Sequence, residues 1–522
     1  MAVFRRLLLV AVLSSAAACA TLPDTPAIPR GAPSVTIVHF NDMHEMVAGA
    51  AGHMGGIGRL STLVRRERAR HSPVLVTLGG DFLSPSAIAT ARVDGEPLAG
   101  RQAVAVLNQL GLDWATFGNH EFDLREEAFR ARLSEIKFGL VSSNVTDNEG
   151  RLFAPAVPSA IVTLRAAGRD LRVGIVGLTV DFTIQPYVRY RPVIESAREQ
   201  IRTFAGKTDA IIALSHLGLP GDTALAEALP EIDLVLGGHE HDNYILRRGS
   251  AFSTLVKADS NAKSAAIVTM TFPAPGARPS IQARIEHLNA SIPPDPAMEA
   301  EVRRWTTTAF AAFARDGFSP ERVVANLPEA LDGRDSTVRT RPGNLTELIT
   351  AAIQRVAAPV DLPIMNGGSI RIDDLLAAGP ITEYDIIRIL PFGGEVLRAE
   401  VTGDLLLETL KTGAANQGTG GYLHPRGAAR VDGEWRLHGQ PIDPERWYSI
   451  ALPEYLLTGA ELGMPFLVRT SPRVRNVKGL GDIRQAVIAE LKARSTGKAV
   501  VFRLSPVQSR PAAGSLLRAP AW

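Results

Sequence analysis

Short apolar runs separated by amphipathic stretches dominate the first half of the chain. The runs are rich in valine, isoleucine and leucine, and most of them end at glycine or at polar residues. Such runs predict buried β-strands, and the stretches at 55–70 and 101–110 predict helices between them. The pattern therefore favours an α/β domain. The expected strands are Val35–Phe40, Val74–Leu78, Leu112–Phe117, Leu171–Leu178, Ala210–Leu214 and Ile232–Leu236.

Residues of types that can bind metals follow five of these strands. In chain order the strand ends carry D-x-H, G-G-D, G-N-H-E, S-H and G-H-x-H. Because sites in α/β sheets form outside the carboxyl ends of the strands, we expect these side chains to converge. The residues concerned are Asp42, His44, Asp81, Asn119, His120, Glu121, His216, His239 and His241.

Each of these residues taken alone has an ordinary explanation. A single aspartate after a strand is usually a helix N-cap, and a single histidine is usually a hydrogen-bonded side chain near the surface. We assign His53, His71 and His287 to that ordinary class. Five such sets at successive strand ends favour a shared metal site over five separate explanations.

The donor types indicate a centre with two divalent ions. Carboxylate, amide and imidazole groups suit Zn²⁺, Mn²⁺ or Fe²⁺, and the set contains no thiolate of the kind that closes a structural zinc site. The seven donors other than His120 and Glu121 exceed what one cation with an open position can use. They suit two cations that share a carboxylate and lie roughly 3.5–4 Å apart. Such a pair acidifies a bound water and holds a phosphoryl oxygen, which predicts hydrolysis of a phosphate ester.

The second half of the chain carries different motifs. A boundary near 291–296 and a helix at 297–315 precede it; this helix is expected to connect two domains, or else to belong to the surface of the first. A strand at Leu362–Met365 leads into N-G-G-S-I-R, which ends at Arg371, and P-F-G follows around Phe392.

These motifs resemble those of a known enzyme family. The five strand ends are similar to the motifs of the calcineurin-like metallophosphoesterases. The F-D after the third motif, N-G-G-x-I-R and P-F-G are similar to the 5′-nucleotidase/UDP-sugar hydrolase branch. The resemblance covers roughly residues 34–505. It implies a four-layer β-sandwich flanked by helices, followed by a smaller α/β substrate domain.

The resemblance also assigns roles to single residues. His120 would be the catalytic imidazole, oriented by Asp123, while a metal-bound hydroxide attacks the phosphate. The metal ligands would be Asp42, His44 and His241 on one ion, Asn119, His216 and His239 on the other, and Asp81 between them. The substrate residues would be Arg339, Asn366, Gly368, Arg371, Phe392, Tyr455 and Glu461.

The substrate domain departs from the branch at two places, one of which is the segment between Arg339 and Gly343, which is shorter than usual. The branch usually has G-G-D-G-Y/F after its second aromatic residue, whereas this chain has G-A-E-L-G around Glu461. The expected reaction is hydrolysis of nucleoside 5′-phosphates. UDP-sugar diphosphatase, 2′,3′-cyclic-nucleotide phosphodiesterase/3′-nucleotidase and thiosulfohydrolase are the alternatives among enzymes. A non-catalytic surface lipoprotein that binds nucleotides is the alternative from another class, and it predicts a lost ligand, although every ligand is present.

Composition and the N-terminus add the cellular context. The chain is 45% hydrophobic with a net charge of +2 and has no polybasic run, which argues against a nucleic-acid polymer as partner. Arg5 and Arg6 precede the apolar run Leu7–Val12, and small residues lead to Cys19, a pattern that resembles a bacterial lipobox. We expect export to the periplasm or cell envelope with a lipid anchor on Cys19. Cleavage after an Ala-x-Ala site, which gives a free protein, is the alternative.

The expected domain organisation follows from these patterns. Because Cys19 is the only cysteine, an intramolecular disulfide is excluded. The oligomeric state stays open. The segments are a signal peptide at 1–19, a linker at 20–33, the phosphoesterase domain at 34–290, a connecting region at 291–330, the substrate domain at 331–505 and a disordered tail at 506–522.

Overall fold

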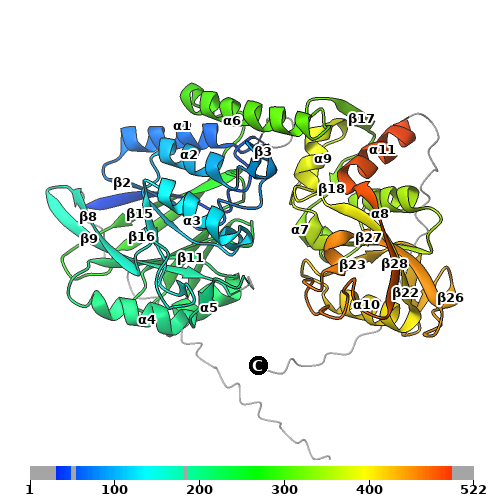
Figure 1. Ribbon diagram of the computed structural model, residues 1–522. Helices are drawn as coiled ribbons and strands as arrows, with labels where there is room; N and C mark the ends of the chain where they lie inside the picture. The colour runs from blue at the N-terminus through cyan, green and yellow to red at the C-terminus, as the bar shows by residue number, and fades with distance from the viewer. Residues whose placement is uncertain (1–30, 49–53, 182–184, 496–522) are drawn as a thin grey trace, which may run out of the picture.

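The computed structural model describes residues 31–48, 54–181 and 185–495. The predicted signal peptide, the lipid site at Cys19 and the tail at 506–522 lie outside these residues. Figure 1 shows two bodies, which we call the first body and the second body in chain order, joined along one side by a long helix. Within the described part of the chain, no helix combines the length and the apolar character needed to cross a bilayer.

Two six-stranded sheets form the first body. The first sheet has the order β16 (Ser280–His287), β15 (Ser264–Thr271), β1 (Ser34–Phe40), β2 (Val74–Leu78), β5 (Trp114–Thr116) and β6 (Gly139–Val141). The second has the order β13 (Tyr244–Arg248), β14 (Ser253–Lys257), β12 (Leu234–Gly237), β11 (Ala210–His216), β9 (Arg169–Thr179) and β8 (Ser159–Ala166).

The two sheets pack face to face because their central strands are apolar on both sides. Ile37 of β1 and Ile175 of β9 are buried in the core between the sheets. Helices cover the two outer faces: α1 (Ile57–Arg70), α2 (Arg101–Leu110) and α3 (Glu126–Glu135) on one, α4 (Val193–Thr203) and α5 (Leu219–Ala228) on the other. This confirms the α/β class and the four-layer sandwich flanked by helices.

The expected elements agree with the structure, with shifts at their ends. Strands β1 and β2 and helix α2 have the predicted bounds within a residue. Helix α1 begins two residues later than expected because Gly55 and Gly56 have φ of 72° and 92°, outside the helical region. Strand β5 is shorter than the apolar run that predicted it, and β12 begins two residues later than predicted.

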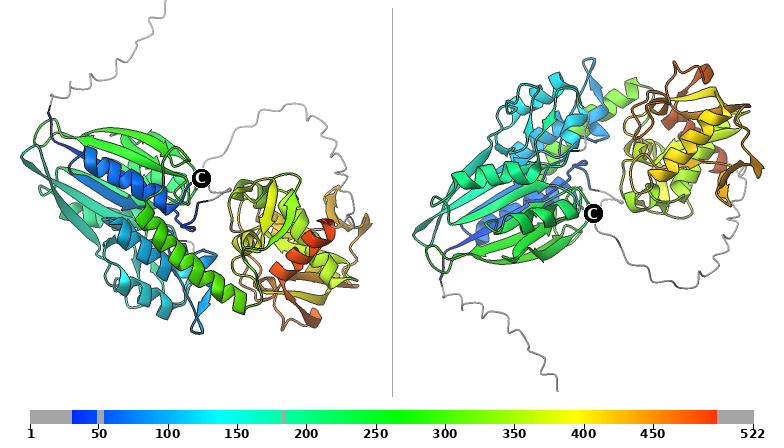
Figure 2. Two further views of the ribbon diagram at one scale, coloured as in Figure 1. Left: turned by 90° about the horizontal axis from the view of Figure 1, so that it is seen from above. Right: turned by 90° about the horizontal axis from the view of Figure 1, so that it is seen from below.

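Helix α6 (Pro296–Arg315) belongs to the surface of the first body and also reaches the second. Asp295 precedes the helix, and its side chain caps it by accepting from the backbone N–H of Ala297 at 3.1 Å. It packs against α1 and α2 through buried residues such as Trp305 and Ala309. Near its end, the rings of Phe310 and Tyr384 lie 4.8 Å apart. Figure 2 shows α6 running from one body to the other.

A five-stranded sheet forms the centre of the second body. Its order is β23 (Leu423–Pro425), β19 (Leu362–Asn366), β27 (Trp447–Pro453), β22 (Glu395–Thr402) and β28 (Val474–Asp482). Helix α10 (Gly403–Ala415) packs with one core of this body, and α8 (Asn344–Ala357), α9 (Glu383–Ile389) and α11 (Ile483–Ser495) pack with another. Strands β17 (Val323–Leu327) and β18 (Leu331–Asp332) and helix α7 (Asp335–Val338) precede β19 in sequence. Strands β20 (Leu375–Leu376) and β21 (Gly379–Thr382) lie between β19 and β22 in sequence and pair with β18 and β17.

Candidate active site

The carboxyl ends of five strands of the first body meet around Asp42. Strands β1, β2 and β5 run parallel in one sheet, and β11 and β12 run parallel in the other, so the loops that leave them lie at one edge. His216 Nε2 lies 3.2 Å from Asp81 Oδ2 and 3.8 Å from Asp42 Oδ1. Asp42, Asp81 and His216 thus form one group whose ligand atoms could share a cation.

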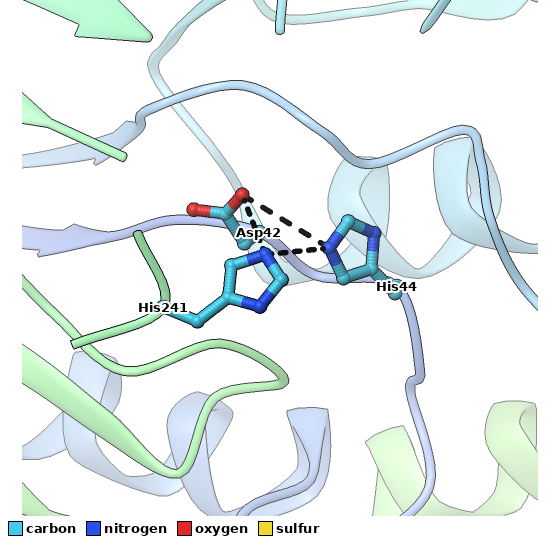
Figure 3. Close-up of side chains that lie close together, drawn as sticks. All are labelled: Asp42, His44 and His241. Carbon is cyan, nitrogen blue, oxygen red and sulfur yellow. Dashed lines mark hydrogen bonds and ion pairs between the residues drawn. The ribbon is translucent and has the colours of Figure 1, made fainter. Parts of the chain in front are cut away.

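A second group with the same property shares Asp42 with the first. His241 Nε2 lies 3.3 Å from Asp42 Oδ1 and 3.2 Å from His44 Nε2. Figure 3 shows both rings turning a nitrogen toward Asp42. Asp42 is the residue common to both groups, whereas the sequence predicts that Asp81 lies between two ions. The bridging role of Asp81 stays a prediction.

Asn119 and His239, the remaining predicted ligands, lie against the first group. The His239 ring centroid is 5.2 Å from that of His216, and the His239 backbone N–H donates to Asp42 Oδ2 at 2.9 Å. Asn119 is buried, and the next backbone N–H, that of His120, donates to Asp81 Oδ1 at 2.8 Å. All seven predicted ligands therefore lie at one edge of the sandwich.

The loops hold several ligands in an unusual backbone conformation. Asp42, Asp81, His239 and His241 have φ of 52°, 56°, 88° and 61°, in the left-handed region. Such conformations cost about 1–3 kcal/mol each for residues other than glycine and cluster at functional sites. Close packing accompanies them, since a Cβ on Gly118 would lie 2.0 Å from Asp81 Oδ1.

Two residues next to the predicted ligands orient the carboxylates. Asn41 donates from its amide to Asp42 Oδ2 at 2.7 Å and accepts from the Ala258 backbone N–H at 2.8 Å. The Glu121 carboxylate accepts from the backbone N–H groups of Asp81 at 3.0 Å and Phe82 at 2.7 Å. Glu121 is one of the strand-end residues named from the sequence, and its position is that of a support for the Asp81 loop.

A buried lysine that sequence reasoning missed ties together the loops of the histidine ligands. Lys257, at the end of β14, donates to the backbone carbonyls of Leu217 at 2.6 Å and Gly238 at 2.8 Å. It also pairs with Asp222 at 2.7 Å and, at a shorter distance, with Glu240. The Leu217 and Gly238 carbonyls follow His216 and precede His239, so Lys257 fixes both loops. The only sign of this role in the sequence is a lysine that directly follows an apolar strand pattern.

The electrostatics of the cluster fit bound cations. Asp42 Oδ1 and His216 Nε2 make no hydrogen bond in the described structure although both are buried. Burial opposes ionisation of Asp42, but His216 and His241 outweigh it and hold the pKa of Asp42 well below its usual range. Burial lowers the pKa of His44 to about 4, so this imidazole is available as a neutral ligand. The donor set of carboxylates, imidazoles and an amide fits divalent ions of the Zn, Mn or Fe type.

His120 and Asp123 form a hydrogen-bonded pair beside the cluster. His120 Nδ1 lies 2.8 Å from Asp123 Oδ2, which also accepts from the Ser84 hydroxyl at 3.0 Å. The His120 and His44 ring centroids are 6.0 Å apart. A carboxylate on Nδ1 leaves Nε2 of the imidazole available for a ligand, which is the geometry of an oriented acid or base.

The predicted substrate residues lie in the second body, several of them around Arg371. The Arg371 guanidinium lies 5.6 Å from the Phe392 ring centroid, and it lines the same small pocket as His44. Asn366 donates to Glu461 at 2.8 Å across 95 positions of sequence. Arg339 pairs with Asp335, and the Gly368 backbone packs against Gly420.

The two aromatic rings of the predicted base site are accessible. Phe392 is 53% exposed and Tyr455 is 44% exposed, which is unusual for rings of this size. A cavity of about 330 Å³ adjoins Phe392 and is also lined by Asp123 and Arg484. The cavity thus contacts residues of both bodies.

Comparison with known proteins agrees with this two-part site. The calcineurin-like phosphoesterase model matches residues 35–243, and the 5′-nucleotidase C-terminal domain model matches residues 323–469. The chain therefore belongs to the 5′-nucleotidase/UDP-sugar hydrolase family, whose two domains these models describe. Members of this family are metal-dependent phosphoester hydrolases. Snake venom 5′-nucleotidase of Naja atra is 26% identical over 503 residues, which cover 83% of this chain and 91% of that protein.

Solved structures share the fold of this 5′-nucleotidase family member over most of its length. The 5′-nucleotidase precursor of Thermus thermophilus has a TM-score of 0.73 and 23% identity, covering 88% of this chain and 97% of that chain. Sulfate thiohydrolase SoxB of Thermus thermophilus has a TM-score of 0.68 and 17% identity, covering 88% and 94%. Because proteins named for different substrates share the fold, the substrate must be argued from the site.

Proposed function

We propose that this protein is an exported 5′-nucleotidase, which hydrolyses nucleoside 5′-phosphates to nucleosides and phosphate. One observation carries the proposal: Arg371 borders His44 of the metal-type cluster and also lies over the exposed ring of Phe392. A single arginine therefore separates a place for phosphate from a place for a base. A nucleotide has both parts, joined through its sugar.

Asp42, His44 and His241 would hold one divalent ion, and Asn119, His216 and His239 the other, with Asp81 between them. When bound, the ions supply a nucleophile from water at neutral pH and neutralise charge on the phosphoryl group. The loops that carry the ligands are fixed by Lys257 and Glu121, which keeps the ligands in place without substrate.

His120 and Arg371 would act on the phosphate itself. The Asp123 carboxylate holds the imidazole through Nδ1, so that Nε2 points a proton at the phosphate or at the leaving 5′-oxygen. Negative charge grows there during cleavage, and a fixed donor stabilises it. Arg371 supplies a second cationic group, and its guanidinium geometry suits two phosphate oxygens.

The base would stack between Phe392 and Tyr455. Arg371 lies next to Phe392, and its charge opposes the rise that burial causes in the pKa of Tyr455. Asn366 and Glu461 form a hydrogen-bonded pair that offers donors and acceptors to the edge of the nucleoside. Arg339 and Gly368 complete the proposed substrate residues.

Export and anchoring follow from the N-terminal sequence. Arg5, Arg6 and the short apolar run before Cys19 support processing as a lipoprotein. Labelling of cells with a radioactive fatty acid is expected to mark the wild type and to miss a Cys19→Ser variant. A wild type that incorporates no label would support the alternative, a free exported protein cleaved after an Ala-x-Ala site.

A substrate panel tests the proposed reaction. At matched metal loading we expect AMP to give the highest kcat/KM, above UDP-glucose, 2′,3′-cAMP and a thiosulfonate substrate. Base stacking contributes about 1–3 kcal/mol, so Phe392→Ala is expected to lower kcat/KM for AMP roughly 5- to 150-fold. Hydrolysis of p-nitrophenyl phosphate, which has no nucleobase, should change much less. A sulfur substrate or a UDP-sugar at the head of the panel would overturn the 5′-nucleotidase assignment.

A further inference from the structure

Asp373 of the second body contacts a predicted metal ligand of the first body. It follows the N-G-G-S-I-R motif, and its Oδ2 accepts a short hydrogen bond from His241 Nδ1. The side chains of both residues are largely buried, at 18% and 16% exposure. The substrate motif itself gave no reason to single out Asp373.

The Asp373 carboxylate is itself fixed. Its Oδ1 accepts from the backbone N–H of Asp335 at 2.8 Å, and its backbone carbonyl accepts from Lys263 Nζ at 3.3 Å. Its φ of 37° lies in the left-handed region, a conformation that the surrounding contacts must hold. A carboxylate with this many contacts presents one oxygen to His241 in a defined direction.

The contact determines how His241 can bind a cation. With Nδ1–H directed at Asp373, the other ring nitrogen, Nε2, faces Asp42 Oδ1 at 3.3 Å and His44 Nε2 at 3.2 Å. A carboxylate on the far nitrogen of a ligating histidine fixes its tautomer and ring orientation and increases its basicity. Such partners typically change metal affinity 10- to 100-fold when they are removed.

A third cation between the acidic residues is the competing explanation. His241, Asp335 and Asp373 are close enough to hold one. Their carboxylates are already engaged, however, because Asp335 pairs with Arg339 and Asp373 accepts hydrogen bonds from His241 and from the Asp335 backbone N–H. The group therefore fits an orienting contact better than a further ion.

We propose that Asp373, a residue of the second body, is a positioning residue for the metal centre. It orients His241 of the first body. The inference rests on the proposed dinuclear site. Since the two residues belong to different bodies, one of the two cation sites is complete only while the bodies are in contact. Binding of the cation at that site must then favour the contact in return, because coupling between two equilibria is reciprocal.

Metal binding by the purified full-length protein tests the proposal. After dialysis against buffered free Mn²⁺, the wild type is expected to retain two equivalents, with an exchange-coupled Mn²⁺ electron paramagnetic resonance spectrum. Asp373→Ala is expected to bind one of the two ions about 10- to 100-fold more weakly and to show the spectrum of isolated Mn²⁺. Asp374→Ala is the matched control, since Asp374 lies beside Asp373 and faces Lys263 at 3.6 Å instead of a ligand. The Asp374→Ala variant should bind both Mn²⁺ ions with the affinities of the wild type.

Two further outcomes separate the possible failures. If circular dichroism shows that Asp373→Ala is unfolded, Asp373→Asn replaces it, and about tenfold weaker binding of one ion is still expected. Two wild-type affinities and a coupled spectrum in a folded Asp373 variant would overturn the positioning role. If the positioning role is overturned while the wild type binds two ions and hydrolyses AMP, the proposed function is still supported. A wild type that binds fewer than two ions would instead refute the dinuclear site.

Discussion

Replacement of Lys257 by methionine is the most informative single perturbation of the site's framework. Methionine keeps an unbranched apolar side chain as far as Cε and removes the ammonium group. In the wild type the ammonium group reaches Asp222 at 2.7 Å and the carbonyls of Leu217 and Gly238, and its side chain is 1% exposed. Removing one partner of a buried ion pair typically costs about 3–5 kcal/mol, because the remaining charge is left without compensation. For a body of this size, about 3 kcal/mol corresponds to a lower Tm by about 6–12 °C.

The cost of Lys257→Met should depend on pH. Burial raises the pKa of Asp222 to about 6, against the opposing effect of Lys257. Without the lysine the pKa of folded Asp222 lies higher still, so above pH 6 the folded variant binds a proton that the folded wild type has lost. The unfolded chains titrate alike. The stability difference therefore grows as pH rises above 6, by about 1.4 kcal/mol per pH unit, until Asp222 ionises in the variant.

Differential scanning calorimetry of the metal-free protein at pH 6 and pH 8 measures both effects. The transition of the first body is identified as the one that added Mn²⁺ raises. Lys137→Met, at an exposed position, is the control and is expected to change stability by less than about 0.5 kcal/mol. If Lys257→Met melted at pH 8 within a degree of that control, the buried ion pair would not hold the two ligand loops, and the reasoning would be wrong.

Three other predictions concern the site itself. His120→Ala should lower kcat for AMP about 10²- to 10⁴-fold with unchanged metal content, and Asp123→Asn should lower kcat less. Steady-state kinetics and metal analysis measure both effects, and loss of both ions in His120→Ala would contradict the prediction. Gly118→Ala should lose metal, because the added Cβ would lie 2.0 Å from a carboxylate oxygen of Asp81, whereas Gly150→Ala, where a Cβ meets nothing within 4 Å, should retain it. Burial favours the neutral form of His216, but two neighbouring carboxylates outweigh this effect and raise the pKa of His216 to about 9. Metal binding at pH 7 should therefore release a proton from His216, and the metal affinity should increase as pH rises toward 9. Titration calorimetry in two buffers of different ionisation enthalpy detects that release, and identical heats would refute it.

Local sequence determined the elements of the first body and the chemistry at their ends. The apolar runs that became β1, β2, β9 and β11 are buried on both faces, so their composition alone shows that they are strands. The ligands follow those strands within a few residues. Because parallel strands align their carboxyl ends, the strand order did not need to be known for convergence to be expected.

Element ends were less predictable than the elements. The run at Leu112–Phe117 predicts a longer strand than β5, because an apolar run shows burial and not hydrogen bonding. For the helix at 297–315 the sequence leaves open whether it connects two domains or covers the first, and α6 does both. A sequence pattern gives the apolar face of a helix, whereas the partner of that face depends on the rest of the fold.

Only the tertiary structure decided which residues support the ligands and which body completes the site. Lys257 and Asp222 are 35 positions apart, and Asp373 lies 132 positions from His241, with no motif linking either pair. Their contacts arise where loops from different strands, or from different bodies, are brought within hydrogen-bond distance by packing. The physical reason is the short range of these interactions: a hydrogen bond or buried ion pair depends on a few ångströms of separation, which the order of residues along the chain does not specify.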